Sequence, residues 1–161
     1  MSTINGGGNK LDYYLGQELD YSVTGCEPDG SRRTQTVVRY TNAAPSSGLP
    51  LYIDARSDLP FGPDGTPQDA NGDTLIYAQV YATQGAVLIQ AERDGTPLEV
   101  SQGQERGRPV YQVPVELAAG DTTELVFHWL EPPTTGDLRT FVTPLVKPAK
   151  VTADGTNCGS G

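Results

Sequence analysis

The chain has 161 residues, a hydrophobic fraction of 36% and a formal net charge of −9, from 11 basic and 20 acidic side chains. This length fits one domain with a single core, and the scattered negative charge excludes the clustered positive field that nucleic-acid binding requires. No run of about 18 apolar residues is present, so the sequence predicts no membrane-spanning helix. We expect one domain that is monomeric in isolation.

The first nine residues contain the glycine run from Gly6 to Gly8 and are predicted to form a flexible linker. The folded domain is then expected to occupy residues 10–161. Residues 1–9 also lack the basic and apolar regions of a signal peptide. Any export signal or membrane anchor is therefore expected in an upstream segment.

Strand periodicity begins directly after this segment. Between Lys10 and Val23, apolar or aromatic side chains recur at every second position, with a break at Gly16 that predicts a turn or bulge. A turn signal at residues 28–30 leads into a β-branched run from Thr34 to Tyr40. The two runs are predicted to pair, with Cys26 at the end of the first. The basic residues of this region, which lie on a predicted solvated strand face, are Arg32, Arg33 and Arg39.

The second half of the chain contains further alternating runs separated by turn signals. Strands are predicted over residues 74–82, 86–91, 98–100, 110–117, 122–130 and 138–146, with a short extension at 150–152. The first three are expected to form a meander, and residues 110–117 and 122–130 a hairpin. Pro114 predicts an edge strand, because proline donates no backbone hydrogen bond to a neighbour.

Many short strands without a helix longer than one turn predict an all-β fold. Two sheets packed face to face hide one face of every strand, so we predict an immunoglobulin-like or fibronectin-III-like sandwich of about seven to nine antiparallel strands. A closed barrel is the alternative. One long connection rich in Pro, Gly and Asp, from Asn42 to Asp73, is expected to interrupt the strands.

Cys26 and Cys158 are the only cysteines, and they lie near opposite ends of the chain. Neither belongs to a Cys-x-x-Cys pair and His128 is the only histidine, so a zinc site lacks ligands. We predict a disulfide between them, worth about 4–5 kcal/mol by the chain-entropy model. Two unrelated buried thiols in a cytosolic protein are the alternative. A disulfide would place the chain in an oxidising, extracytoplasmic compartment.

No pattern in the sequence indicates catalysis. The nucleophile elbow, the phosphate-binding loop and the dinucleotide fingerprint are all missing. His128 lies in the middle of a predicted strand without a neighbouring nucleophile or orienting carboxylate, which indicates a structural histidine. A non-enzymatic protein without a cofactor is therefore predicted.

The acidic loop offers one weak metal motif. Asp69, Asn71 and Asp73 place oxygen side chains at positions 1, 3 and 5, as in a calcium loop. The match then fails, because Thr74 and Val80 occupy the positions of the required Gly and Glu. The alternative is a solvated loop in which Asp and Asn side chains cap their own backbone.

Two groups of side chains are candidates for binding a partner. Apolar residues gather in the long loop at Leu49, Leu51, Tyr52, Leu59 and Phe61. They are expected to form either an interaction surface or a satellite core folded over the sandwich end. Aromatic rings for a glycan platform would come from Tyr13, Tyr14, Tyr52, Tyr77, Tyr81 and Tyr111.

Several stretches resemble a known bacterial family, namely Gly7–Leu15, Thr41–Pro45 with Gly48–Pro50, and Glu105–Val110. They are similar to the C-terminal segment of the family known as domain of unknown function 4012. The resemblance implies an actinobacterial protein with an upstream membrane anchor, a larger extracytoplasmic region and a setting near the envelope or surface polysaccharide. It assigns no catalytic residue.

Together these expectations predict a non-enzymatic module of the cell envelope, held at the cell surface by an upstream segment. It would act as a spacer or as a docking domain for an envelope protein or polysaccharide. The alternative is a carbohydrate-binding or calcium-dependent adhesion module.

Overall fold

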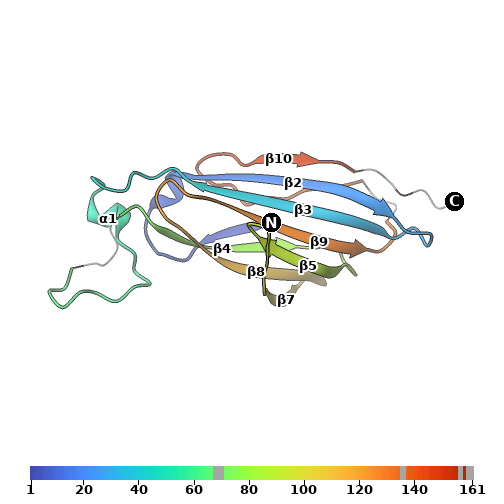
Figure 1. Ribbon diagram of the computed structural model, residues 1–161, viewed down its shortest axis with the longest axis horizontal. Helices are drawn as coiled ribbons and strands as arrows, with labels where there is room; N and C mark the ends of the chain where they lie inside the picture. Colours follow the sequence, from blue (N-terminus) through green and yellow to red (C-terminus); the bar gives the residue numbers. More distant parts are fainter. Residues whose placement is uncertain (67–70, 135–136, 156–157, 159–161) are drawn as a thin grey trace.

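The computed structural model describes residues 1–66, 71–134, 137–155 and 158, and its strands form two sheets (Figure 1). In spatial order, the four-stranded sheet contains β1 (Ser2–Asn5), β4 (Thr74–Tyr81), β8 (Arg108–Leu117) and β7 (Ser101–Glu105). The six-stranded sheet contains β10 (Lys150–Ala153), β2 (Leu15–Cys26), β3 (Arg32–Asn42), β9 (Thr122–Glu131), β5 (Val87–Arg93) and β6 (Thr96–Pro97). The short helices are η1 (Leu11–Tyr13) and α1 (Leu51–Asp54).

The core lies between the sheets, where alternate side chains of the long strands point inward. Leu125, Phe127 and Trp129 of β9 are at most 2% exposed, and Ile76 and Ala78 of β4 are fully buried. The rings of Phe127 and Trp129 stack with centroids 5.6 Å apart. The predicted all-β sandwich is therefore confirmed.

Residues 1–9 are part of the sandwich, so the predicted linker is wrong. β1 pairs antiparallel with β4, from Ser2 opposite Gln79 to Asn5 opposite Ile76. The glycine that follows β1 is required by close packing, since a Cβ on Gly6 would lie 2.6 Å from the ring of Tyr77. Close packing therefore explains a glycine in this run. Composition alone does not distinguish a glycine required by packing from a glycine in a flexible linker.

Two predicted local pairings are also wrong. β4 and β5 lie in different sheets, and so do β8 and β9, so neither the meander nor the hairpin exists. The turns at residues 82–86 and 118–121 instead carry the chain from one sheet to the other. An alternating strand buries the same face whichever neighbour it pairs with, so periodicity does not determine the pairing.

Pro114 does not mark an edge strand, because β8 lies between β4 and β7. The pairing of β7 with β8 ends at Gln112, however, so no strand of the described residues pairs with Pro114 on that side of β8. The missing N–H is tolerated there for the reason that applies at a true edge.

The C-terminal part of the described chain differs from the prediction. Residues 138–146 form no strand, and the last strand is the short β10. β10 runs parallel to β2, whereas every other pair of strands in the described residues is antiparallel. Because β3 is antiparallel to both β2 and β9, β10 runs in the same direction as β9 as well as β2. With β1 and the two-residue β6, the described strands number ten.

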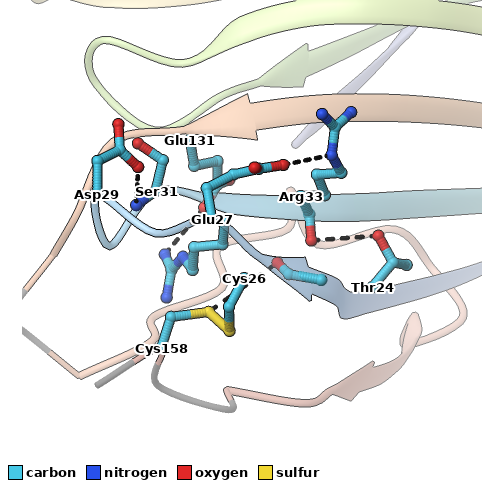
Figure 2. Close-up of a disulfide and its surroundings, with 10 residues drawn as sticks. Thr24, Cys26, Glu27, Asp29, Ser31, Arg33, Glu131 and Cys158 are labelled. Carbon is cyan, nitrogen blue, oxygen red and sulfur yellow. Dashed lines mark hydrogen bonds and ion pairs between the residues drawn. A yellow bond between two sulfur atoms is a disulfide. The ribbon is translucent and has the colours of Figure 1, made fainter. Parts of the chain in front are cut away.

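The predicted hairpin of β2 with β3 and the predicted disulfide are confirmed. Cys26 ends β2 opposite Arg32, and a bulge lies between Val23 and Gly25. Cys26 is bonded to Cys158, with the two Cα atoms 5.5 Å apart, and Figure 2 shows the bond beneath the β2–β3 turn. The bond fixes the segment after β10 to the end of β2. None of the helices in the described ranges has the length and apolar character needed to cross a bilayer.

Candidate functional site

The long connection between β3 and β4 carries α1 and forms one end of the molecule, opposite the β2–β3 turn (Figure 1). Leu51, Tyr52 and Phe61 in this connection are 54%, 70% and 65% exposed, and Leu49 and Leu59 are half-buried. We call these five residues the apolar tip. Because three of them face solvent, the tip is not the satellite core considered as an alternative.

Two buried charged residues fix the base of the tip. Asp54 is 1% exposed, and its Oδ1 accepts a hydrogen bond of 2.9 Å from the backbone N–H of Gly72. The Arg56 guanidinium, also buried, forms ion pairs of 2.5 Å with Asp58 and 3.0 Å with Glu116 of β8. The Asp54 contact ties the end of α1 to Gly72, just before β4, and the Arg56 contact ties the following residues to β8, so the tip is presented on an anchored base.

Asp54 provides a test of this anchoring. Burial raises its pKa above the ordinary value, and the second oxygen, Oδ2, has no hydrogen-bond partner in the described part of the chain. A carboxyl whose folded-state pKa is raised stabilises the fold below its unfolded pKa, and this stability is lost as pH rises through the folded value. We expect Asp54→Asn to flatten the pH dependence of unfolding, because the amide oxygen still accepts from Gly72 without a buried charge.

Asp54→Ala is the matched comparison. It leaves the Gly72 N–H without its acceptor and is expected to cost about 1–3 kcal/mol at neutral pH. Urea unfolding of the three proteins at acidic and neutral pH measures both effects. Equal pH slopes for wild type and Asp54→Asn would show that Asp54 titrates alike in the folded and unfolded chain.

The predicted calcium ligands are only partly within the described residues, because Asp69 lies outside them. Asn71 Oδ1 accepts from the backbone N–H of Asp73 at 3.4 Å, and Asp73 Oδ1 accepts from that of Ala119 at 3.2 Å. Asn71 thus caps its own backbone, as the solvated-loop alternative requires. Across the described ranges, no group of three His, Cys, Asp or Glu side chains is arranged to hold a metal ion.

The candidate glycan platform is reduced to two rings. Tyr13 and Tyr52 are 60% and 70% exposed, whereas Tyr111 is buried and Tyr14, Tyr77 and Tyr81 are half-buried. The Lys10 ammonium lies 5.4 Å from the centroid of the Tyr52 ring, a cation–π contact at the side of the tip.

A buried ion pair was missed by the sequence analysis, which placed Arg32 on a solvated strand face. Arg32 is 7% exposed, and its Nη2 lies 2.8 Å from Oε2 of Glu131, which is 3% exposed. Glu131 also accepts hydrogen bonds from the Tyr21 and Thr83 hydroxyls. Burial, followed by the negative charge of Glu131, raises the pKa of Tyr21 to about 12. Arg33 and Arg39, in contrast, are substantially exposed, as predicted.

His128 lies on the outer face of β9 and is half-exposed. Its Nε2 is 3.7 Å from Oε1 of Glu92 on the neighbouring β5. An imidazole beside one carboxylate on a strand surface has the geometry of a cross-strand pair.

These features define a two-sheet β-sandwich with a disulfide at one end and an exposed apolar tip at the other. A scan against protein-family models found no match, and a search of curated proteins found none either. The resemblance to the domain of unknown function 4012 therefore stays a prediction. Among solved structures, an M1 zinc metallopeptidase from Deinococcus radiodurans matches 76% of this chain at 14% identity and a TM-score of 0.36. The match spans 22% of that protein, and a likeness at this TM-score supports no conclusion about activity.

Proposed function

We propose that the chain is a non-enzymatic module of the cell envelope that docks another envelope component through its apolar tip. The exposure of Leu51, Tyr52 and Phe61 on an anchored base carries this proposal. Large apolar side chains grouped on a monomer's surface commonly mark a contact site. The disulfide supports an extracytoplasmic location, because oxidising compartments preserve such bonds.

The spacer role forms part of the same proposal. The tip and the disulfide lie at opposite ends of the long axis (Figure 1), so the sandwich separates a contact surface from the fixed end of β2. We also propose an immunoglobulin-like or fibronectin-III-like type of sandwich. The crossings between sheets after β4 and after β8 support it, since such sandwiches connect their sheets in this way.

The docking role is tested by co-sedimentation with purified actinobacterial envelope fragments. We expect the wild-type chain to sediment with the fragments and the triple variant Leu51→Ser/Tyr52→Ser/Phe61→Ser to stay in the supernatant. The control is Val87→Ser/Ile89→Ser on β5, which removes side chains that are 55% and 54% exposed elsewhere on the molecule. Equal sedimentation of the wild type and the tip variant would contradict docking through the tip.

Pretreating the fragments separates the two kinds of partner. Loss of sedimentation after protease digestion identifies a protein, and loss after glycosidase digestion identifies a polysaccharide. The second result favours the carbohydrate-binding alternative, in which Tyr13 and Tyr52 supply the exposed rings.

A calcium-dependent adhesion module is tested by thermal melts with added calcium and with a chelator. We expect the two melts to coincide, because Asn71 and Asp73 already accept backbone hydrogen bonds. A ligand that binds only the folded state raises the melting temperature. A rise of several degrees with calcium would favour the adhesion module.

A further inference from the structure

A groove of ≈ 560 Å³ opens between the two sheets at the edge where β2 approaches β1 and β4. Tyr21, Tyr81 and Trp129 contribute to its walls, and residues 138–143 form a further wall. Phe141 in that segment is 74% exposed. The volume falls within the range of about 300–1,000 Å³ that small-ligand sites occupy.

Two unpaired arginines line this groove. Arg108 and Arg139 are exposed, and neither guanidinium has a hydrogen-bond or ion-pair partner within the described ranges. Most other arginines of the chain are held by carboxylates, namely Arg32, Arg33, Arg39, Arg56 and Arg93. Since the chain as a whole carries a net charge of −9, two free guanidinium groups beside one groove create a local positive field.

Glu131 is the acidic residue among the described residues that line the groove, and its negative charge does not cancel the positive field. Glu131 is engaged by Arg32 at 2.8 Å, and its two oxygens accept hydrogen bonds from Tyr21 and Thr83. Its charge is therefore already paired within the wall. Glu105 lies opposite Arg108 in the β7–β8 ladder, and its Oε2 accepts a 2.7 Å hydrogen bond from the Tyr81 hydroxyl. No ion pair joins Glu105 to Arg108 within the described ranges, so the Arg108 and Arg139 guanidinium groups stay available to a ligand.

We propose that this groove binds a saccharide that bears a carboxylate, such as a uronic acid unit of a polysaccharide. A guanidinium group matches the planar geometry of a carboxylate and forms paired hydrogen bonds with it. The exposed Phe141 ring and the Tyr81 ring offer apolar surface to the C–H face of a sugar, and the Tyr81 hydroxyl is oriented by a 2.7 Å hydrogen bond to Glu105.

An extended acidic peptide fits the same place less well. Peptides that bind beside a sheet usually pair with an open strand edge. Residues 141–143 already lie along the chain at Met1, whose carbonyl accepts a 3.0 Å hydrogen bond from the backbone N–H of Thr143. The groove presents aromatic rings and guanidinium groups. The rings suit the C–H face of a sugar, and the guanidinium groups suit its carboxylate. The groove shares no residue with the apolar tip. The saccharide proposal is therefore tested independently of the docking role.

The test is calorimetric titration of the full chain with oligosaccharides that contain galacturonate or glucuronate. We expect binding that weakens as ionic strength rises, because salt screens the arginine charges. A neutral oligosaccharide of the same length, maltotetraose, is expected to bind at least about tenfold more weakly. Failure of every uronate ligand to bind overturns the proposal. Equal binding of tetraglutamate also overturns it, in favour of an acidic peptide.

Charge-neutralising variants locate the site. Arg108→Gln and Arg139→Gln are each expected to weaken uronate binding about tenfold. Arg106→Gln is the matched control, since it removes the same charge from an exposed residue outside the groove and should change the affinity by less than about twofold. Thermal melts of all three variants check that they remain folded. An equal loss of affinity in the Arg106 variant would show a general charge effect and overturn the site.

Discussion

Loss of the disulfide is expected to lower the free energy of unfolding by about 2–5 kcal/mol. The bond between Cys26 and Cys158 spans 132 residues of sequence, so it closes almost the whole chain into one loop. The chain-entropy model places the upper end of this range on loops of such length, because the cross-link removes the largest number of unfolded conformations. The measurement is urea unfolding of the double variant Cys26→Ser/Cys158→Ser.

The structure predicts that the loss begins at β10. All four residues of β10 are exposed, and its side-chain anchor is the Lys150–Glu18 ion pair, whose partners are 82% and 41% exposed. An exposed pair contributes little to stability. Without the disulfide, β10 is therefore expected to separate from β2 before the sandwich unfolds, which would return some chain entropy to the folded state and reduce the global loss.

Amide hydrogen exchange distinguishes the two levels of unfolding. Faster exchange restricted to β10 and to residues 18–21 of β2, its partners in the ladder, is the expected result. Reduced wild-type protein is the control and should behave as the double variant does. Uniformly faster exchange across both sheets would contradict local release of β10. It would show that loss of the disulfide lowers the free energy of global unfolding by the full amount.

Truncation of Glu131 is the second change with a large expected effect. Glu131→Ala leaves a buried Arg32 guanidinium without its carboxylate and removes the acceptor of the Tyr21 and Thr83 hydroxyls. Breaking one side of a buried ion pair costs about 3–5 kcal/mol, because an uncompensated charge stays in a poorly solvated place. Chemical denaturation of the variant measures this loss.

Glu124→Ala is the matched control. Glu124 lies on the same strand and also accepts from an arginine, Arg39, but both side chains of that pair are about 40% exposed. An exposed pair of this kind is worth at most about 1 kcal/mol. Equal losses for the two variants would show that burial of the Arg32–Glu131 pair has no energetic consequence.

The same cluster has a pH signature in Tyr21. Its pKa is about 12 in the folded chain against an ordinary value of 10.0. Because the folded pKa is raised, the stability contributed by Tyr21 is fully present below pH 10 and is lost as the pH rises toward 12. Ultraviolet titration of phenolate in the wild type and in Tyr21→Phe should differ by one group ionising near pH 12, and Glu131→Gln should lower that value.

The strand faces and the disulfide were predictable from the sequence because both depend on local pattern or on elimination. Alternation along residues 122–130 puts Leu125, Phe127 and Trp129 on one face of the strand, and that face is buried in the structure. With two cysteines and one histidine, a bridge was the chemistry the residues supported. The exposure of Tyr52 and Phe61 agrees with the interaction surface, one of the two alternatives considered for the long loop.

The candidate site was only partly predictable. The sequence identified the residues of the apolar tip but not Asp54 or Arg56, which anchor it. A buried carboxylate leaves no mark in a loop already rich in aspartate, since its burial depends on Gly72, 18 residues away. The groove has no sequence signal either, because its walls come from both sheets and from a segment that was predicted to be a strand.

The sequence by itself predicted that alternating strands stack in two layers and that Cys26 and Cys158 are bonded, and the structure has both features. Only the tertiary structure decided which strands are neighbours, that residues 2–5 complete a sheet, and that Arg32 is buried. Periodicity records the environment of a side chain but not the identity of its neighbour. The acceptor of Arg32 lies 99 residues away, and only the packing of β3 against β9 brings the two charges together.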